Sequence, residues 1–305
     1  MADFFVIDFL DVETEKSGDA IAIRYEISGQ QRVHLVDGGY QATGPSIVQH
    51  INTHYGTNRI DYLVVTHCDR DHTGGLVHVL ENMEVGSLWM LRPWLYAEEL
   101  LPRFATYSDV DRLRSRLRSI YSSLKAIEEL AIRLGVPILD PFQGARIGAF
   151  TVLAPTRSRY LDLIVDSDKT PESVEEAEAT AMDRLGWMLA EAAKKAVSLV
   201  AGAWNFEYFP AEGTSCENEM SVVQAANLSG NKIVLTADAG RQGLAEAADY
   251  ADAIGFGLPG VDRIQVPHHG SRRNVSTELL DRWLGPRLPA QPAAGSGNFS
   301  AIVSS

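Results

Sequence analysis

Apolar and polar positions alternate along residues 4–91 in a way that predicts several short strands. In residues 20–27, Ile21, Ile23 and Tyr25 alternate with smaller or charged side chains, which is the period of a strand with one buried face. Turn residues such as Asp37-Gly38-Gly39 separate the apolar stretches. We therefore expect strands at 4–10, 20–27, 33–36, 62–65 and 85–91, and helices over 45–55 and from residue 76 onward.

Helical and strand-like patterns also alternate in the rest of the chain. Apolar residues at helical spacing run through 109–134, and a hairpin-like pair of stretches follows at 145–154. Residues 157–200 are again helix-rich, with a capping box over 173–176 that opens a helix. We expect further strands after residue 221 and at 233–235, 264–266 and 299–303. The prediction is one domain over 1–305 with helical insertions at about 93–135 and 157–200.

The strand at 62–65 is followed by a loop with a high density of ionisable residues. Six consecutive residues hold the four potential metal ligands His67, Asp69, Asp71 and His72. On an extended segment His67 and Asp69 point the same way, so they can hold one ion. Asp71 and His72 can serve a second ion as the chain turns into a helix, and Gly74-Gly75 lets the backbone pass close to the site. A polar surface loop is the simpler alternative, but four such residues at this spacing favour a polynuclear metal site.

The loop resembles the HxHxDH signature of the metallo-β-lactamase fold, with Asp69 in place of the second histidine. The resulting HxDxDH pattern is similar to that of the hydrolase domain of the ComEC/Rec2 competence proteins and their soluble relatives. Residues 9–12, 18–21 and 37–39 also match segments of that family. The resemblance implies an α/β (α+β) fold, the αββα four-layer sandwich, in which helices cover two sheets packed face to face. Asp37 would then lie beneath the metal loop and orient it, or else form an ordinary Asp-Gly turn.

Three later segments match the same family. The resemblance implies that Asp238, in a Thr-x-Asp segment, is a carboxylate that bridges two ions, although a helix N-cap is the ordinary alternative. In the segment His268-His269-Gly270-Ser271, His268 is expected as a metal ligand and His269 as a catalytic group on the substrate side. Either histidine also fits a simple loop. Substrate contacts are expected from Asn218, Ser221 and Ser271.

The resemblance predicts two divalent metal ions, zinc or manganese. One would be held by His67, Asp69 and Asp238, and the other by Asp71, His72, Asp238 and His268. Asp71 is also expected to accept a proton during catalysis. Because an aspartate replaces a histidine at position 69, the site is harder than a histidine-rich zinc site, which favours Mn²⁺. We expect Cys216, which lies outside the matching positions, to be structural.

These observations predict a dinuclear metal-dependent hydrolase. The reaction we expect is cleavage of a phosphodiester in a nucleic acid or nucleotide by a metal-bound hydroxide. One alternative is a metallo-hydrolase of a lactone, thioester or β-lactam, and the exchange of histidine for aspartate weighs against it. A second alternative is a non-catalytic metal-binding scaffold or sensor whose helical insertions bind a partner protein.

Composition narrows the setting of this activity. A net charge of −13 argues against broad, non-specific binding to the phosphate backbone of a nucleic acid. Bound cations would nevertheless make the electrostatic potential inside a metal site positive. With two cysteines, no run of 18 apolar residues and no basic N-terminal region, we expect a cytoplasmic protein with no membrane segment. Oligomeric state is left open.

One stretch of this acidic chain is locally basic. Its arginines are Arg112, Arg114, Arg116 and Arg118. At every second residue they spread around a helix, which favours a solvated helix face. The alternative is a lid that supplies cations to an anionic substrate.

Overall fold

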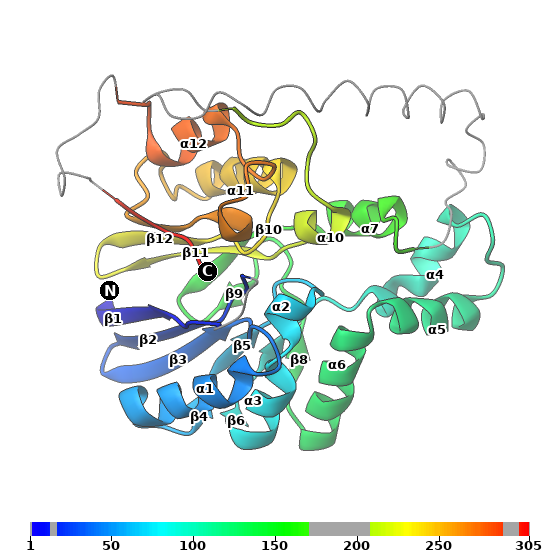
Figure 1. The fold of residues 1–305 in the computed structure, drawn as a ribbon, viewed down its shortest axis with the longest axis horizontal. Helices are drawn as coiled ribbons and strands as arrows, with labels where there is room; N and C mark the ends of the chain where they lie inside the picture. Colours follow the sequence, from blue (N-terminus) through cyan, green and yellow to red (C-terminus); the bar gives the residue numbers. More distant parts are fainter. Residues whose placement is uncertain (1, 13–16, 171–207, 289–298, 305) are drawn as a thin grey trace.

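Two six-stranded sheets packed face to face form the centre of the molecule, and helices cover both outer faces (Figure 1). The computed structural model describes residues 2–12, 17–170, 208–288 and 299–304. The mixed α/β sandwich predicted from the sequence is confirmed. None of the helices in the described ranges has the length and apolar character that a membrane crossing requires.

The first sheet has the strand order β1-β2-β3-β5-β7-β8. Its first three strands pair in antiparallel fashion, and β3, β5, β7 and β8 pair in parallel. The strands are β1 (Ala2–Phe9), β2 (Ile21–Ile27), β3 (Gln30–Val36), β5 (Tyr62–Val64), β7 (Leu88–Trp89) and β8 (Ile138–Leu139), with β4 (Arg59–Ile60) and β6 (Glu84–Val85) paired separately. The helical segments between them are α1 (Thr43–His50), the π-helical turn η1 (Ile51–Tyr55), α2 (Arg70–Thr73) and α3 (Leu76–Asn82).

The second sheet has the order β14-β13-β12-β11-β10-β9. Its strands β12, β13 and β14 pair in parallel, and the others are antiparallel. The strands are β9 (Arg146–Ile147), β10 (Phe150–Ala154), β11 (Val223–Leu228), β12 (Asn231–Leu235), β13 (Arg263–Gln265) and β14 (Ser300–Ile302). The accompanying helical segments are α10 (Cys216–Glu219), α11 (Arg241–Ala253), η5 (Pro267–Gly270) and α12 (Thr277–Leu284).

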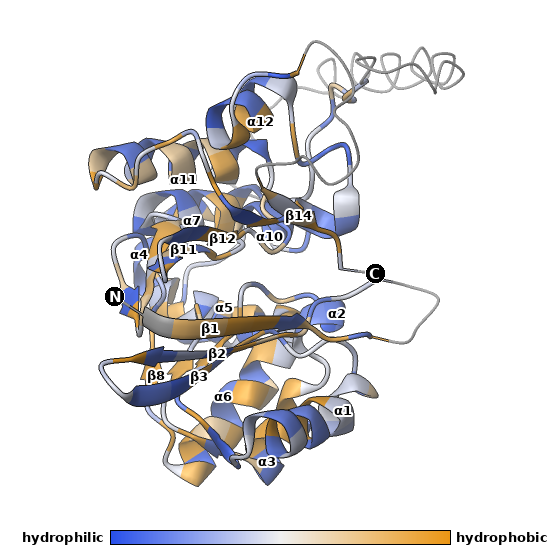
Figure 2. Cartoon of the chain, turned by 90° about the vertical axis from the view of Figure 1, so that its left-hand side faces the viewer, coloured by the Kyte–Doolittle hydropathy of each residue, from blue (hydrophilic) through white to orange (hydrophobic). Residues whose placement is uncertain are grey.

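Strand alternation decides which residues enter which layer. In β2, Ile21 and Ile23 point between the sheets and pack in a cluster with Phe150 of the second sheet. The intervening Ala22 faces the opposite side, in a cluster that includes Ile47 of α1. Figure 2 shows the layers edge-on, with α11 and α12 above the second sheet and α1 and α3 below the first. Both sheets therefore bury apolar side chains on each face, so their polar groups concentrate at the strand ends.

The first helical insertion packs beside the first sheet and is not one continuous helix. The predicted helical stretch 109–134 divides at Tyr121, whose backbone (φ −93, ψ 52) leaves the helical region. Its parts are η2 (Pro93–Tyr96), α4 (Ala97–Leu100), η3 (Leu101–Arg103), α5 (Val110–Ile120) and α6 (Ser122–Leu134). Of the second insertion the described part contains α7 (Arg157–Asp166), while the capping box predicted over 173–176 lies outside the described residues.

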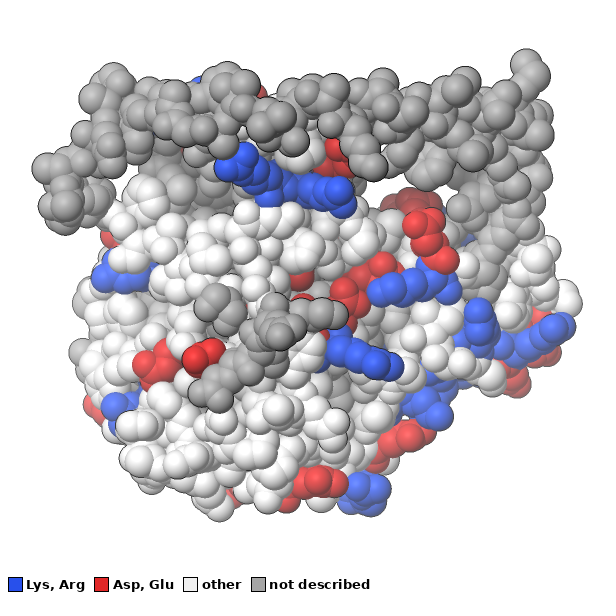
Figure 3. All heavy atoms as spheres, viewed as in Figure 1, with Lys and Arg blue, Asp and Glu red and all other residues white. Residues whose placement is uncertain are grey.

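The arginines of α5 are partly used within the insertion itself. Arg118 pairs with the buried Glu128, and its guanidinium lies 5.0 Å from the ring centre of Trp94. Arg114 pairs with Asp111. Figure 3 shows Lys and Arg side chains interleaved with Asp and Glu on this face, without a continuous basic surface. Arg118 therefore stabilises the packing of the insertion, whereas Arg112 and Arg116 are exposed, and the lid stays a prediction.

Candidate metal centre

The metal loop, residues 66–75, begins just after β5 ends and contains the short helix α2. Asp69 precedes α2 in extended backbone (φ −73, ψ 151). A Cβ atom on Gly75 would lie 2.3 Å from the carbonyl oxygen of Gly38, and one on Gly74 would lie 2.6 Å from the backbone nitrogen of Gln41. A larger residue at either position would have to push backbone away. The close backbone approach predicted for these two glycines is confirmed.

Asp37 lies beneath the metal loop, as expected, and fixes two of its histidines. Its buried carboxylate accepts hydrogen bonds from the Thr66 N–H at 2.9 Å and the Thr66 hydroxyl at 2.6 Å. It also accepts one from Nδ1 of His72 at 2.8 Å, while the Thr66 hydroxyl accepts one from Nδ1 of His67 at 3.0 Å. Both rings thus carry their proton on Nδ1, which leaves a lone pair on each Nε2.

Asp238 and two histidines reach the same place from the second sheet. Asp238 follows β12, and His268 and His269 follow β13 within η5. Both histidines have left-handed backbone, with φ of 48° and 52°. Such a conformation costs about 1–3 kcal/mol per residue, so neighbouring contacts must hold it. One such contact is a hydrogen bond from the backbone N–H of His268 to the carbonyl oxygen of Ala237 at 3.1 Å.

One group of potential ligand atoms surrounds Oδ2 of Asp238. Nε2 of His67 lies 3.9 Å from this oxygen, and Nε2 of His268 lies 3.6 Å from it. Oδ2 of Asp69 lies 3.9 Å from Nε2 of His67. Ligand atoms around a tetrahedral ion with bonds of 2.0–2.2 Å lie about 3.3–3.6 Å apart. Small side-chain movements would therefore bring this group around one ion.

A second group surrounds the other carboxylate oxygen, Oδ1 of Asp238. Nε2 of His72 lies 3.3 Å from it and Nε2 of His269 lies 3.8 Å from it. Oδ2 of Asp71 is 4.0 Å from the His72 nitrogen and 3.7 Å from the His269 nitrogen. From the sequence, His268 was expected in this group, whereas the structure places His269 here and His268 in the first group. The two oxygens of Asp238 thus face different groups, which is the arrangement that a bridging carboxylate would need.

Buried atoms without hydrogen-bond partners gather at this point. Within the described residues they include Nε2 of His67, His72 and His269 and Oδ1 of Asp238. Buried polar atoms are normally hydrogen-bonded, so four such atoms in one place are the kind of donor set that a bound cation would satisfy. Imidazole nitrogens and carboxylate oxygens are the donors of zinc and manganese sites. The residues present therefore fit divalent metal ions.

The electrostatics of the centre favour a positive charge between His72 and Asp238. Burial lowers the pKa of His72, but Asp238 and Asp37 outweigh burial and raise that pKa well above its ordinary value. Burial raises the pKa of Asp238, yet His72 and then His67 bring it below its ordinary value overall. Burial and His72 together lower the pKa of His67. The place where the charge is favoured is where a metal ion would bind.

Asp19 belongs to the centre but was not predicted as a site residue. Its buried carboxylate lies 3.7 Å from Nδ1 of His72 and 4.0 Å from Nδ1 of His269. One oxygen accepts a hydrogen bond from Nε2 of Gln265 at 2.7 Å. Burial raises the pKa of Asp19. Asp19 groups with His72, Asp238 and His269 as a further potential ligand, and the signal for it was the Gly18-Asp19 turn before a buried strand.

Two further supporting residues hold the histidines of the second sheet. Asn274 is buried, and its Nδ2 donates to the backbone carbonyl of Asp238 at 2.8 Å. Its Oδ1 lies 3.0 Å from Nδ1 of His268, so Nε2 of that ring is the nitrogen that faces Asp238. The hydroxyl of Ser304 lies 3.2 Å from Nδ1 of His269. No sequence pattern pointed to either residue.

The residues predicted to contact substrate occupy different environments. Asn218 is buried, donates to Oγ1 of Thr214 at 2.7 Å and lies 3.1 Å from Nδ1 of His268. Ser221 is fully buried, and within the described residues its hydroxyl has no partner. The hydroxyl of Ser271 accepts a hydrogen bond from the N–H of Arg273 at 3.4 Å. Asn218 thus supports His268, and substrate contact by all three stays a prediction.

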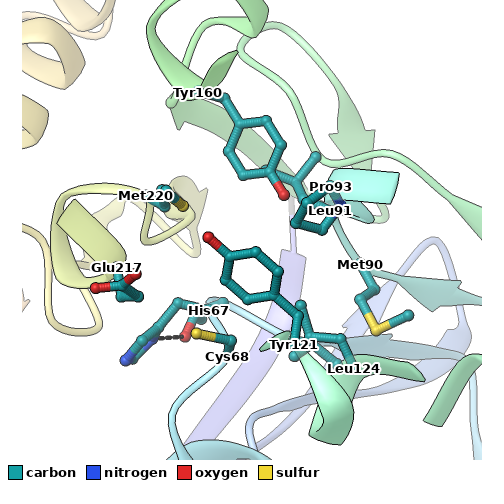
Figure 4. Close-up of a pocket in the computed structure, with 12 residues that line it drawn as sticks. His67, Cys68, Met90, Leu91, Pro93, Tyr121, Leu124, Tyr160, Glu217 and Met220 are labelled. Atoms are coloured by element: carbon teal, nitrogen blue, oxygen red, sulfur yellow. Dashed lines mark hydrogen bonds between the residues drawn. The ribbon is translucent and has the colours of Figure 1, made fainter. Parts of the chain in front are cut away.

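Behind the metal loop lies a small cavity of about 20 Å³, large enough for roughly one water molecule (Figure 4). His67, Cys68 and Tyr121 line it, together with apolar side chains. Burial, and then Asp69, raise the pKa of the Cys68 thiol. Burial and neighbouring carboxylates raise the pKa of Cys216 to about 11. Both free thiols therefore stay protonated at neutral pH, which agrees with a structural role for Cys216.

Comparisons with known proteins bear on the family. Residues 15–140, which include the metal loop, match the family model of the metallo-beta-lactamase superfamily. Among curated proteins no sequence match was found. Similar solved structures include the Rm3 metallo-beta-lactamase (12% identity, 87% of this chain and 76% of that chain, TM-score 0.36). They also include the hydrolase AbOPH of the beta lactamase superfamily (12% identity, 78% of this chain and 69% of that chain, TM-score 0.36). A third is MEM-A1, a subclass B3 metallo-beta-lactamase from a soil metagenome library (11% identity, 88% of this chain and 76% of that chain, TM-score 0.37). Residues 15–140 therefore match the metallo-beta-lactamase superfamily, and the described chain is a sandwich of two sheets with helices on both outer faces.

Proposed function

We propose that this chain is a dinuclear metal-dependent hydrolase that cleaves phosphodiesters of nucleic acids or nucleotides. The observation that carries the proposal is the division of ligand atoms between the two oxygens of Asp238, which offers adjacent positions for two divalent ions. When bound, such ions lower the pKa of a water molecule and neutralise charge that grows on a phosphoryl oxygen.

The two positions differ in the residues that would hold them. The first would use His67, Asp69, Asp238 and His268, and the second Asp71, His72, Asp238 and His269. The carboxylates make this donor set hard, which favours Mn²⁺ over a histidine-rich zinc site. This assignment exchanges the roles expected for the two adjacent histidines, because the Nε2 of His269 is the one beside Asp71.

Asp71 is the residue best placed to accept a proton from the attacking water. Burial raises its pKa, but His269 and then His72 lower that pKa overall, so the carboxylate is ionised at neutral pH. Its Oδ2 lies beside Nε2 of His269 at 3.7 Å. The Asp71 side chain is 26% exposed, so a proton taken up there could pass on to water.

Charge balance favours a phosphodiester over a neutral acyl group. The carboxylates of Asp69, Asp71 and Asp238 would offset part of the charge of two divalent ions. The charge that the ions keep toward the substrate would attract a phosphodiester, which is negative before attack. A lactone, thioester or β-lactam gains less from it, because its carbonyl is neutral before attack.

The test is hydrolysis of a generic phosphodiester by metal-stripped protein refilled with Mn²⁺ or Zn²⁺. We expect turnover that depends on metal and is abolished in Asp71→Ala and Asp238→Ala. The control is Asp162→Ala, because this aspartate pairs with Arg103 on the surface. A lactone, a thioester and a β-lactam are assayed in parallel. Turnover of only these substrates would replace the proposal with an acyl hydrolase, and metal binding without any turnover would favour a scaffold or sensor.

A further inference from the structure

We propose that a cavity beside the metal loop binds a second phosphate group of the substrate, next to the phosphodiester that is cleaved. The inference rests on the proposed function and names the class of substrate. The cavity has a volume of about 190 Å³ and lies between the metal loop and the start of α6. It is smaller than the roughly 300 Å³ at which pockets for drug-sized ligands begin, so it suits one compact group.

The position of the cavity ties it to the metal centre. Asp69 belongs to both, because its Oδ2 faces Nε2 of His67 at 3.9 Å while its Oδ1 faces Nζ of Lys169 at 3.2 Å. The hydroxyl of Ser123 donates to the carbonyl of Cys68 at 2.8 Å, which fixes the start of α6 against the metal loop. Only one carboxylate separates Lys169 from the ligand atoms. A group bound in the cavity is therefore adjacent to the substrate atoms at the ions.

Two cationic side chains line this cavity. Arg70 is exposed and has no ion pair within the described residues. Lys169 is half exposed and contacts Asp69 and, at 3.7 Å, Glu217. One Glu217 oxygen already accepts a hydrogen bond from the hydroxyl of Ser167. A metal ion bound to Asp69 would compete with Lys169 for that carboxylate, which would free the ammonium group for an anion.

The start of α6 adds a third kind of anion contact. This helix of 13 residues has no side-chain cap in the described structure, and its first residues, Ser122 and Ser123, line the cavity. Free N–H groups at a helix start attract anions, and phosphate groups above all. Together with Arg70 and Lys169 they form the set of donors that binds phosphate oxygens. The cavity would thus select a substrate with a phosphate beside the scissile bond, such as a 5′-phosphorylated dinucleotide or a short nucleic acid.

The kinetic test compares two phosphodiesters, a 5′-phosphorylated dinucleotide and bis(p-nitrophenyl) phosphate, which has one phosphate. In Lys169→Met and in Arg70→Gln we expect kcat/KM for the dinucleotide to fall about 10- to 100-fold, mainly through KM, with little change for the aryl diester. The matched controls are Lys125→Met and Arg133→Gln, two positions on α6 that do not line the cavity. An equal loss on both substrates would overturn the proposal, because it would indicate a disturbed metal centre.

A binding test separates this proposal from the proposed function. Calorimetric titration of metal-loaded protein with inorganic phosphate should show weaker binding in Lys169→Met and Arg70→Gln than in the controls. If these two variants bind phosphate more weakly but neither diester is hydrolysed, the phosphate site is supported and the phosphodiesterase proposal is wrong. Unchanged phosphate binding would overturn the phosphate site whatever the turnover.

Discussion

Replacing Asp37 with asparagine tests whether the metal centre depends on the residue beneath the loop as well as on the ligands. Asparagine has nearly the same shape, and it tolerates the left-handed backbone that Asp37 adopts (φ 58) better than alanine does. The change therefore isolates the charge and the hydrogen bonds. It leaves all proposed ligands in place.

The expected magnitude follows from the three hydrogen bonds that Asp37 accepts from Thr66 and His72. An asparagine offers one oxygen and one NH₂ group, so the NH₂ must face Thr66 or His72. If it faces His72, the ring must carry its proton on Nε2, and the lone pair toward Asp238 is lost. Loss of such a supporting carboxylate weakens metal binding by about 10- to 100-fold, which is about 1.4–2.7 kcal/mol. We expect a loss of metal affinity of about 100-fold, because His72 would no longer be in the tautomer that can bind the ion.

The assay is metal affinity measured by competition with a chromophoric chelator. The control is Asp61→Asn, at the opposite end of β5, where the carboxylate accepts a hydrogen bond from the Val33 N–H at 2.9 Å. Circular dichroism confirms that both variants fold. Wild-type affinity in folded Asp37→Asn would refute the reasoning, because the histidines would then keep their tautomers without the carboxylate.

Three further predictions concern residues around the core and the site. Burial lowers the pKa of His34 from 6.5 to about 3, so between these pH values the unfolded state binds a proton that the folded state does not. As the pH falls through this range, the free energy of unfolding should fall by about 1.4 kcal/mol per pH unit. Urea unfolding of His34→Gln should lack this component, and an equal pH slope in both proteins would contradict the prediction. Arg118→Gln leaves Glu128 without its closest cation and should lower the free energy of unfolding, measured in urea, by about 2 kcal/mol. KM for phosphodiesters should stay unchanged, and a raised KM would restore the lid hypothesis. Ser304→Ala removes the hydroxyl beside Nδ1 of His269 and should lower turnover about tenfold, with Ser276→Ala, at the start of α12, as the control; equal rates would show that Ser304 is dispensable.

Much of the fold could be predicted because strand alternation survives in the sequence. Ile21 and Ile23 alternate with smaller residues, and the structure sends them to the layer between the sheets. The division of 109–134 into two helices was missed, because apolar spacing continues across Tyr121 while its backbone leaves the helix. Periodicity reports which face is buried and does not report a local break in direction.

The candidate site was predictable where its residues are neighbours in sequence. The four ionisable residues of the metal loop stand within six positions, so their convergence follows from one turn. The grouping of His268 and His269 could not be predicted, because it depends on left-handed backbone at both residues. Asn274 and Ser304 act on those rings from loops that only the folded chain brings near.

The proposed ligands come from both sheets, with consequences for how long the protein survives. Residues 67–72 follow β5 in the first sheet, and residues 238, 268 and 269 follow β12 and β13 in the second. An ion that binds both sets would close a long loop of chain and add its binding energy to folding. Metal starvation would then loosen the contact between the sheets and expose the chain to proteases. The supply of metal would set the abundance of this protein as well as its activity.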